Sequence, residues 1–132
     1  MKKPPFYKSL LYSIKGIFWM LKSERNFQLE VLALIVNLFL IVYFELSSTD
    51  AALIILVCFL VLITEALNTA VEKICNFVEP NFNKKIGLIK DIAAGAVILA
   101  TFLSIIVGIL VYSNYFFFFF FNILHFRKCN LQ

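Results

Sequence analysis

The acidic side chains within the most apolar part of this sequence are the residues best suited to chemistry. Glu65, Asn68 and Glu72 follow one another at steps of three and four residues in a largely apolar segment. On a helix that turns about 100° per residue, this spacing places the three side chains within one narrow arc. Charged groups are costly to bury in lipid and are usually functional there. The spacing therefore predicts one polar site on one face of a helix.

Further charges lie at the ends of neighbouring apolar segments. Glu24 precedes one segment and the pair Lys90-Asp91 opens another, so three helices can bring charged groups to the level of Glu72. Glu65 would lie one heptad deeper, about 10 Å at 1.5 Å per residue. Clustered carboxylates repel one another unless a cation joins them. Because proteins usually hold Mg²⁺ with one or two carboxylates and substrate phosphates, the outer carboxylates suit magnesium.

This set of groups meets the needs of phosphoryl transfer. Lys90 supplies a positive charge for phosphates, and Glu65, partly desolvated in its helix, is a usable base for an attacking hydroxyl. A water-soluble anion could reach the outer carboxylates while the head of a lipid approaches Glu65. The sequence contains neither a Walker A motif nor the Gly-rich loop of protein kinases. A kinase built on these residues would bind nucleotide without either motif.

The composition indicates that the solvent for most of this chain is lipid. Of its 132 residues, 62% are apolar and 15% charged, and the mean hydropathy is +0.93. A water-soluble domain of this length could hardly bury so much apolar surface. Lys and Arg exceed Asp and Glu by 12 to 8, which membrane orientation explains without a nucleic-acid partner. We expect one all-α, multi-pass membrane domain.

The hydrophobic pattern predicts a surface helix followed by three transmembrane helices. Over 6–21, large apolar residues recur every three or four positions, with lysines on another face. This is typical of an amphipathic helix that lies in the membrane interface. The expected spans are 28–44, 51–77 and 91–112. A tight polar turn at 45–50 and a solvated loop at 79–89 would join them.

The lysines and arginines predict how the chain crosses the membrane. Nine of the twelve precede the first span or lie between the second and third spans. By the positive-inside rule, the N-terminus and the loop at 79–89 face the cytoplasm. Residues 1–112 would form the membrane domain, and 113–132 a Phe-rich tail at the far interface with no assigned function.

Two other kinds of feature are not expected. Polar residues and lysines interrupt any apolar segment behind Lys2 and Lys3, so we expect no cleaved signal peptide. The three cysteines and the single histidine lack the spacing of a disulfide framework or a zinc site.

The residues that carry the chemistry resemble the prokaryotic diacylglycerol kinase and undecaprenol kinase family of small membrane lipid kinases. The resemblance covers residues 12–112 and rests on three blocks: SERNFQ at 23–28, EALNTAVE at 65–72 and KDIAAGAV at 90–97. It implies a surface helix and three transmembrane helices per chain. It also implies a homotrimer in the bacterial cytoplasmic (inner) membrane, with active sites shared between subunits.

The resemblance further implies a role for single residues. Glu65 would be the general base that deprotonates the lipid hydroxyl, and Asn68 would help to position the reacting groups. Glu24 and Glu72 would hold Mg²⁺ and ATP, the phosphoryl donor. The remaining nucleotide contacts would be Tyr12, Lys90 and Asp91.

Some positions depart from the family pattern. Many members read Gln-Ile-His where this chain has Gln28-Leu29-Glu30, and Asn76 replaces a common aspartate. Glu30 resembles the diacylglycerol kinases, whereas the first and third blocks favour undecaprenol kinase, so both acceptors stay open. The alternative function is a non-catalytic membrane subunit that binds a partner helix through its polar face.

Overall fold

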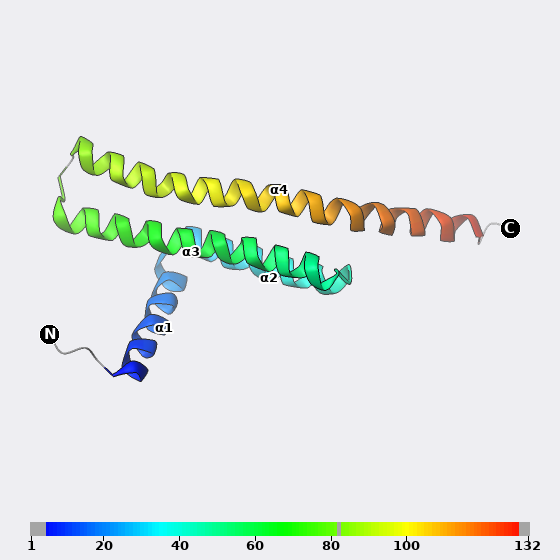
Figure 1. Ribbon diagram of the computed structural model, residues 1–132, viewed down its shortest axis with the longest axis horizontal. Coiled ribbons are helices and arrows are strands. Elements are labelled where there is room, and N and C mark those ends of the chain that lie inside the picture. Colours follow the sequence, from blue (N-terminus) through cyan, green and yellow to red (C-terminus); the bar gives the residue numbers. More distant parts are fainter. Residues whose placement is uncertain (1–4, 82, 130–132) are drawn as a thin grey trace.

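The described part of the chain folds into four helices, three of which run side by side. The computed structural model describes the backbone of residues 5–81 and 83–129 and the side chains as far as Phe117. The helices are α1 (Phe6–Ser23), α2 (Arg25–Tyr43), α3 (Ser48–Val78) and α4 (Lys84–Cys129). In Figure 1, α2, α3 and α4 form an elongated bundle, and α1 leaves it at a steep angle.

The all-α membrane class is confirmed. By length and composition, α2, α3 and the part of α4 as far as Phe117 are each able to cross a membrane. Many large apolar side chains on the outer faces of these helices are exposed. Such exposure suits helices in lipid, where apolar side chains can face acyl chains and the backbone groups along a helix bond to one another. The chain is therefore a multi-pass membrane protein.

The loop between the second and third spans is shorter than the sequence predicted. A loop was expected through Ile89, but α4 begins at Lys84. The cause is Asn83, whose side-chain oxygen accepts the Lys85 N–H at 2.9 Å and whose carbonyl accepts the Gly87 N–H at 2.8 Å. Asparagine is a favoured N-cap because it satisfies free N–H groups at a helix start. The second half of the expected loop is therefore helical.

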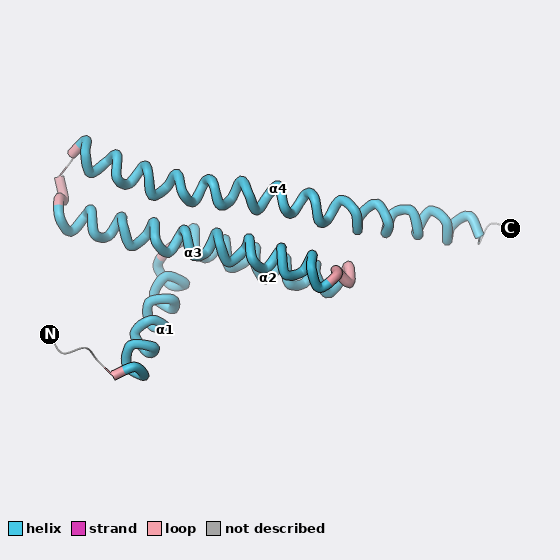
Figure 2. The backbone as a smooth tube through the Cα atoms, viewed as in Figure 1, coloured by secondary structure: helices cyan, strands magenta, loops and turns pink. Residues whose placement is uncertain are grey.

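Helix α4 is much longer than its neighbours. It has 46 residues, against 19 in α2 and 31 in α3, and it continues well past the α2–α3 turn (Figure 2). The expected boundary at Tyr112 is not a helix end. Side chains 118–129 and residues 130–132 of the expected Phe-rich tail lie outside the described part of the chain, as do residues 1–4, where the signal-peptide expectation begins.

The core of the bundle lies along α3, which packs against both α2 and α4. Ile54, Val57, Val61 and Leu62 of α3 are buried. The first three repeat at three- and four-residue steps and Leu62 adjoins Val61, so one broad face of α3 is covered. Because this face also carries Glu65, the packing that buries the apolar residues determines where that carboxylate points.

Two tyrosines of α4 form hydrogen bonds to the other helices at the end of the bundle remote from α1. The Tyr112 hydroxyl donates to Asn37 Oδ1 at 2.9 Å. The Tyr115 hydroxyl donates to Asp50 Oδ2 at 2.6 Å and accepts the Ser47 N–H at 2.9 Å. Ser47 is the N-cap of α3, so Tyr115 bonds to the turn that joins α2 to α3.

We predict that Tyr115→Phe destabilises the bundle, because one hydroxyl serves both a carboxylate and a backbone N–H. The free energy of unfolding should fall by about 1–2 kcal/mol, the range for two hydrogen bonds in a membrane bundle. Equilibrium unfolding in mixed micelles measures this change. Tyr7→Phe on α1 is the matched control, since Tyr7 is exposed. Equal stability of the two variants would contradict the account of the turn.

Candidate functional site

The polar face of α3 points into the bundle, as the three-four spacing requires. Glu65 is 4% exposed and Asn68 8% exposed. The side-chain oxygen of Asn68 is buried and bonds to no group in the described part of the chain. Glu72, two turns along α3, is exposed. The polar face is therefore closed at Glu65 and open at Glu72.

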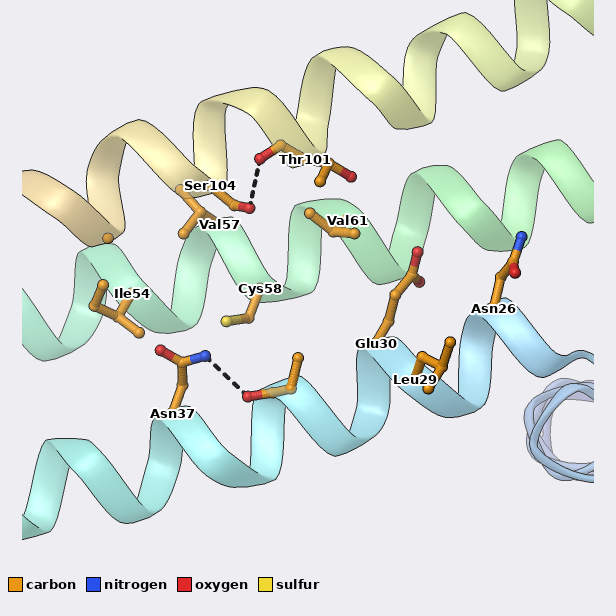
Figure 3. Close-up of a pocket in the computed structure, with 12 residues that line it drawn as sticks. Asn26, Leu29, Glu30, Asn37, Ile54, Val57, Cys58, Val61, Thr101 and Ser104 are labelled. Atoms are coloured by element: carbon orange, nitrogen blue, oxygen red, sulfur yellow. Dashed lines mark hydrogen bonds between the residues drawn. The ribbon is translucent and has the colours of Figure 1, made fainter.

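A second carboxylate faces this buried region from α2. Glu30 is half-buried, and its Oε2 atom is buried without a hydrogen-bond partner among the described residues. It lies close enough to Glu65 for the two charges to repel each other. Figure 3 shows the Glu30 side chain reaching from α2 towards α3. Two carboxyl groups from different helices thus share one poorly hydrated region.

No chemical role was expected for Glu30 from the sequence. A signal for it was available, because Glu30 lies inside the span expected at 28–44 and a carboxylate there is costly. The sequence alone does not show that Glu30 lies near Glu65. Its nearness to Glu65 depends on how α2 crosses α3.

Glu30 also lines a cavity of about 380 Å³ that lies between α2, α3 and α4. This volume is within the range of small-molecule sites. Its walls are mostly apolar, with Val57, Cys58 and Val61 from α3 and Gly108 from α4. Val61 lies one turn from Glu65 on the same face of α3. The apolar cavity therefore extends towards the buried carboxylate.

A lysine from α3 pairs with the outer carboxylate at the α1–α2 junction. Lys73 Nζ lies 3.0 Å from Glu24 Oε1. Lys73 directly follows Glu72, so this ion pair brings the junction to the level of Glu72 on α3. Lys73 was not among the residues expected at this site, although a basic residue beside the last acidic residue of the second block was a usable signal.

Helix α4 reaches the same end of α3 through Lys90. The Lys90 ammonium donates to Asn76 Oδ1 at 2.6 Å. Asn76 lies one turn beyond Glu72, and residues four apart share a helix face. Lys90 therefore lies within about one turn of the level of Glu72. The expected meeting of charged groups from three helices corresponds to this end of the bundle.

Two predicted nucleotide contacts lie outside this group in a single chain. Tyr12 is 58% exposed on α1, and the Lys15 ammonium lies 6.0 Å from its ring centre. Asp91 is exposed on α4. The side chains that the structure describes include no cluster of three or more His, Cys, Asp or Glu residues able to hold a metal. Two carboxylates nevertheless suit Mg²⁺ when substrate phosphates supply further oxygens.

Comparisons with known proteins match most of this chain. Residues 11–112 match the family model described as prokaryotic diacylglycerol kinase. An undecaprenol kinase of Bacillus subtilis (strain 168) is 32% identical over 107 residues, which are 81% of this chain and 87% of that protein. A diacylglycerol kinase of Synechocystis is 30% identical over 106 residues, 80% of this chain and 61% of that protein. A diacylglycerol kinase of Escherichia coli (strain K12) is 27% identical over 109 residues, which are 82% of this chain and 89% of that protein.

The matched region ends inside α4. The family match includes the helix junction at Glu24, the polar face of α3 and the start of α4, and it stops at Tyr112. Helix α4 continues beyond that point into the Phe-rich segment. The region shared with the relatives is therefore the part of the bundle that contains the candidate site.

We predict that Glu30→Gln stabilises the protein, because one carboxylate oxygen of Glu30 is buried without a hydrogen-bond partner among the described residues. Glutamine keeps the shape of glutamate but removes a charge that lies partly buried beside Glu65. The free energy of unfolding should rise by about 1 kcal/mol, because burying a polar group without a hydrogen bond costs about this much. Thermal unfolding in detergent measures it, with Glu45→Gln in the exposed turn as the control. The arrangement is refuted if Glu30→Gln is no more stable than this control.

Proposed function

This chain belongs to the prokaryotic diacylglycerol kinase family of lipid kinases, and we propose that it transfers the γ-phosphate of ATP to the hydroxyl of a membrane lipid. Diacylglycerol and undecaprenol are the candidate acceptors, as the names of the relatives suggest. The observation that carries the proposal is the burial of Glu65 one heptad from Glu72, beside an apolar cavity and below an open polar end of the bundle.

The acceptor lipid would bind on the apolar side of the site. Its hydrocarbon would occupy the cavity between α2, α3 and α4, and its hydroxyl would approach Glu65. The Glu65 carboxylate would take the hydroxyl proton as the oxygen attacks the γ-phosphorus and the bond to the bridging oxygen of ADP breaks. Asn68 has a buried amide oxygen free to position the reacting groups. A site closed to bulk water also protects the phosphoryl group from hydrolysis.

The nucleotide would bind at the open end of the bundle. Glu24 and Glu72 are hard oxygen donors suited to Mg²⁺, which would neutralise phosphate charge when bound. Lys90 would contact phosphate oxygens from α4, because a lysine ammonium is a compact point charge for such groups. Tyr12 and Asp91 are the further proposed contacts of the nucleotide. Together with Lys90, these two residues would complete the nucleotide site that the sequence predicts.

The assembly would be a homotrimer in the bacterial inner membrane with the N-terminus in the cytoplasm. The excess of basic residues before α2 and around the α3–α4 loop supports this orientation. Many apolar side chains remain exposed on one chain, which leaves surface for neighbouring copies as well as lipid. The exposed positions of Tyr12 and Asp91 also favour sites completed between subunits.

We predict that Glu65→Gln reduces phosphoryl transfer about 10²–10⁴-fold, the usual contribution of a general base. The assay follows label from γ-labelled ATP into diacylglycerol or undecaprenol in the presence of Mg²⁺. Glu79→Gln at the end of α3 is the control and should keep wild-type activity. Near-normal activity of Glu65→Gln would favour the packing role of a non-catalytic subunit. Failure of the wild type to phosphorylate either lipid would refute the proposed function.

We also predict that Glu24→Gln and Glu72→Gln each raise the Mg²⁺ concentration needed for half-maximal activity. The increase should be at least about 10-fold, since even indirect metal partners contribute that much. Titration of activity with Mg²⁺ at fixed ATP measures it, and chelation should abolish the activity. Glu45→Gln, remote from this end of the bundle, should titrate like the wild type. An unchanged Mg²⁺ requirement in both site variants would exclude these residues as ligands.

A further inference from the structure

Lys73 joins three helices through one ammonium group. Its Nζ atom lies 3.0 Å from Glu24 Oε1 and 5.0 Å from the centre of the Trp19 ring. Trp19 lies in the last part of α1, Glu24 separates α1 from α2, and Lys73 is on α3. The position of α1 relative to the bundle is therefore coupled to one cation.

The backbone at Glu24 makes this contact sensitive to what the carboxylate binds. Glu24 is the single residue between α1 and α2, with an extended backbone at φ −110° and ψ 110°. Its N–H donates to the Met20 carbonyl. Glu24 is therefore both the C-cap of α1 and the N-cap of α2. A change of partner at this carboxylate therefore acts at the hinge between the two helices.

The ion pair can open without repacking the core. The Glu24 side chain is 25% exposed and the Lys73 side chain 56% exposed. An ion pair with one well-exposed partner is weak, because water competes for the ammonium. Lys73 can therefore leave Glu24 when a stronger partner for either group arrives.

We propose that Lys73 is a further nucleotide-binding residue that exchanges Glu24 for a phosphate oxygen when the magnesium–nucleotide complex binds. The inference rests on the proposed function, in which Glu24 binds Mg²⁺. A divalent cation on this carboxylate would lie within a few ångströms of the ammonium, and the two would repel each other. The phosphates bring negative charge to the same place, and a charge-assisted hydrogen bond to phosphate can replace the lost pair.

The exchange would also change the surroundings of Trp19. When the ammonium moves towards phosphate, the indole loses the cation near its ring, an interaction that contributes to holding α1 against α3. Trp19 is the sole tryptophan of the 132 residues. Its fluorescence therefore reports the surroundings of this one side chain in the full-length protein.

The first test titrates the full chain in bilayer discs with Mg²⁺ and the non-hydrolysable analogue AMP-PNP. The wild type should show a saturable change in Trp19 emission. Lys73→Met should bind the complex several-fold more weakly and show no emission change. Lys73→Arg should keep the response, since a guanidinium also pairs with carboxylates and stacks on aromatic rings. Lys84→Met, which removes a charge at the start of α4, is the matched control and should respond like the wild type.

The second test measures binding of Mn²⁺ alone by electron paramagnetic resonance. Lys73→Met should bind Mn²⁺ roughly two- to fivefold more tightly, because Glu24 no longer has to release an ion-pair partner. The variant would thus bind the bare cation more tightly and the nucleotide complex more weakly. A lysine that served only to hold the helices together would not produce these opposite changes.

The outcomes separate this inference from the proposed function. Bound AMP-PNP, measured with labelled nucleotide, together with unchanged Trp19 emission would overturn the exchange and leave the kinase proposal standing. A wild-type emission change in Lys73→Met, or unchanged Mn²⁺ affinity, would also overturn it. Failure of the wild type to bind labelled nucleotide would overturn both proposals.

Discussion

A carboxylate on a membrane-spanning helix must face protein, water or a cation, because lipid offers it no partner. Glu65 meets this requirement by pointing into the bundle, where it is 4% exposed. Glu72, on the same face of α3, meets it at the open end. The rotation of α3 about its axis is therefore constrained by its acidic residues as much as by its apolar ones. That rotation determines which residues line the cavity.

The site lies where an apolar region meets a charged one. On one side is the cavity between α2, α3 and α4, with Glu30 in its wall. On the other are the Glu24–Lys73 ion pair and the Lys90–Asn76 hydrogen bond. A kinase that joins a water-soluble donor to a lipid acceptor needs such a boundary. Glu65 and Glu72 lie about 10 Å apart along the helix, and in the proposed reaction the phosphate would bridge this distance.

Much of this arrangement could be predicted from the sequence because helix periodicity is a local property. The shared face of Glu65 and Asn68 follows from spacing alone, and the three spans follow from hydropathy. Contacts between helices could not be predicted in this way. The proximity of Glu30 to Glu65 and the pairing of Lys73 with Glu24 depend on how separate helices cross. The early start of α4 differs from the expected loop because Asn83 caps the helix.

The proposed function requires that carboxylates from the α1–α2 junction and from α3 meet around one divalent cation. It is tested most directly by a crystal structure of the full chain with Mn²⁺ and AMP-PNP, in which anomalous scattering locates the metal. The account predicts one Mn²⁺ peak within coordination distance of both Glu24 and Glu72 and of the nucleotide phosphates, with Glu65 on the side of the lipid. A peak that contacts neither carboxylate while the nucleotide is bound would contradict it.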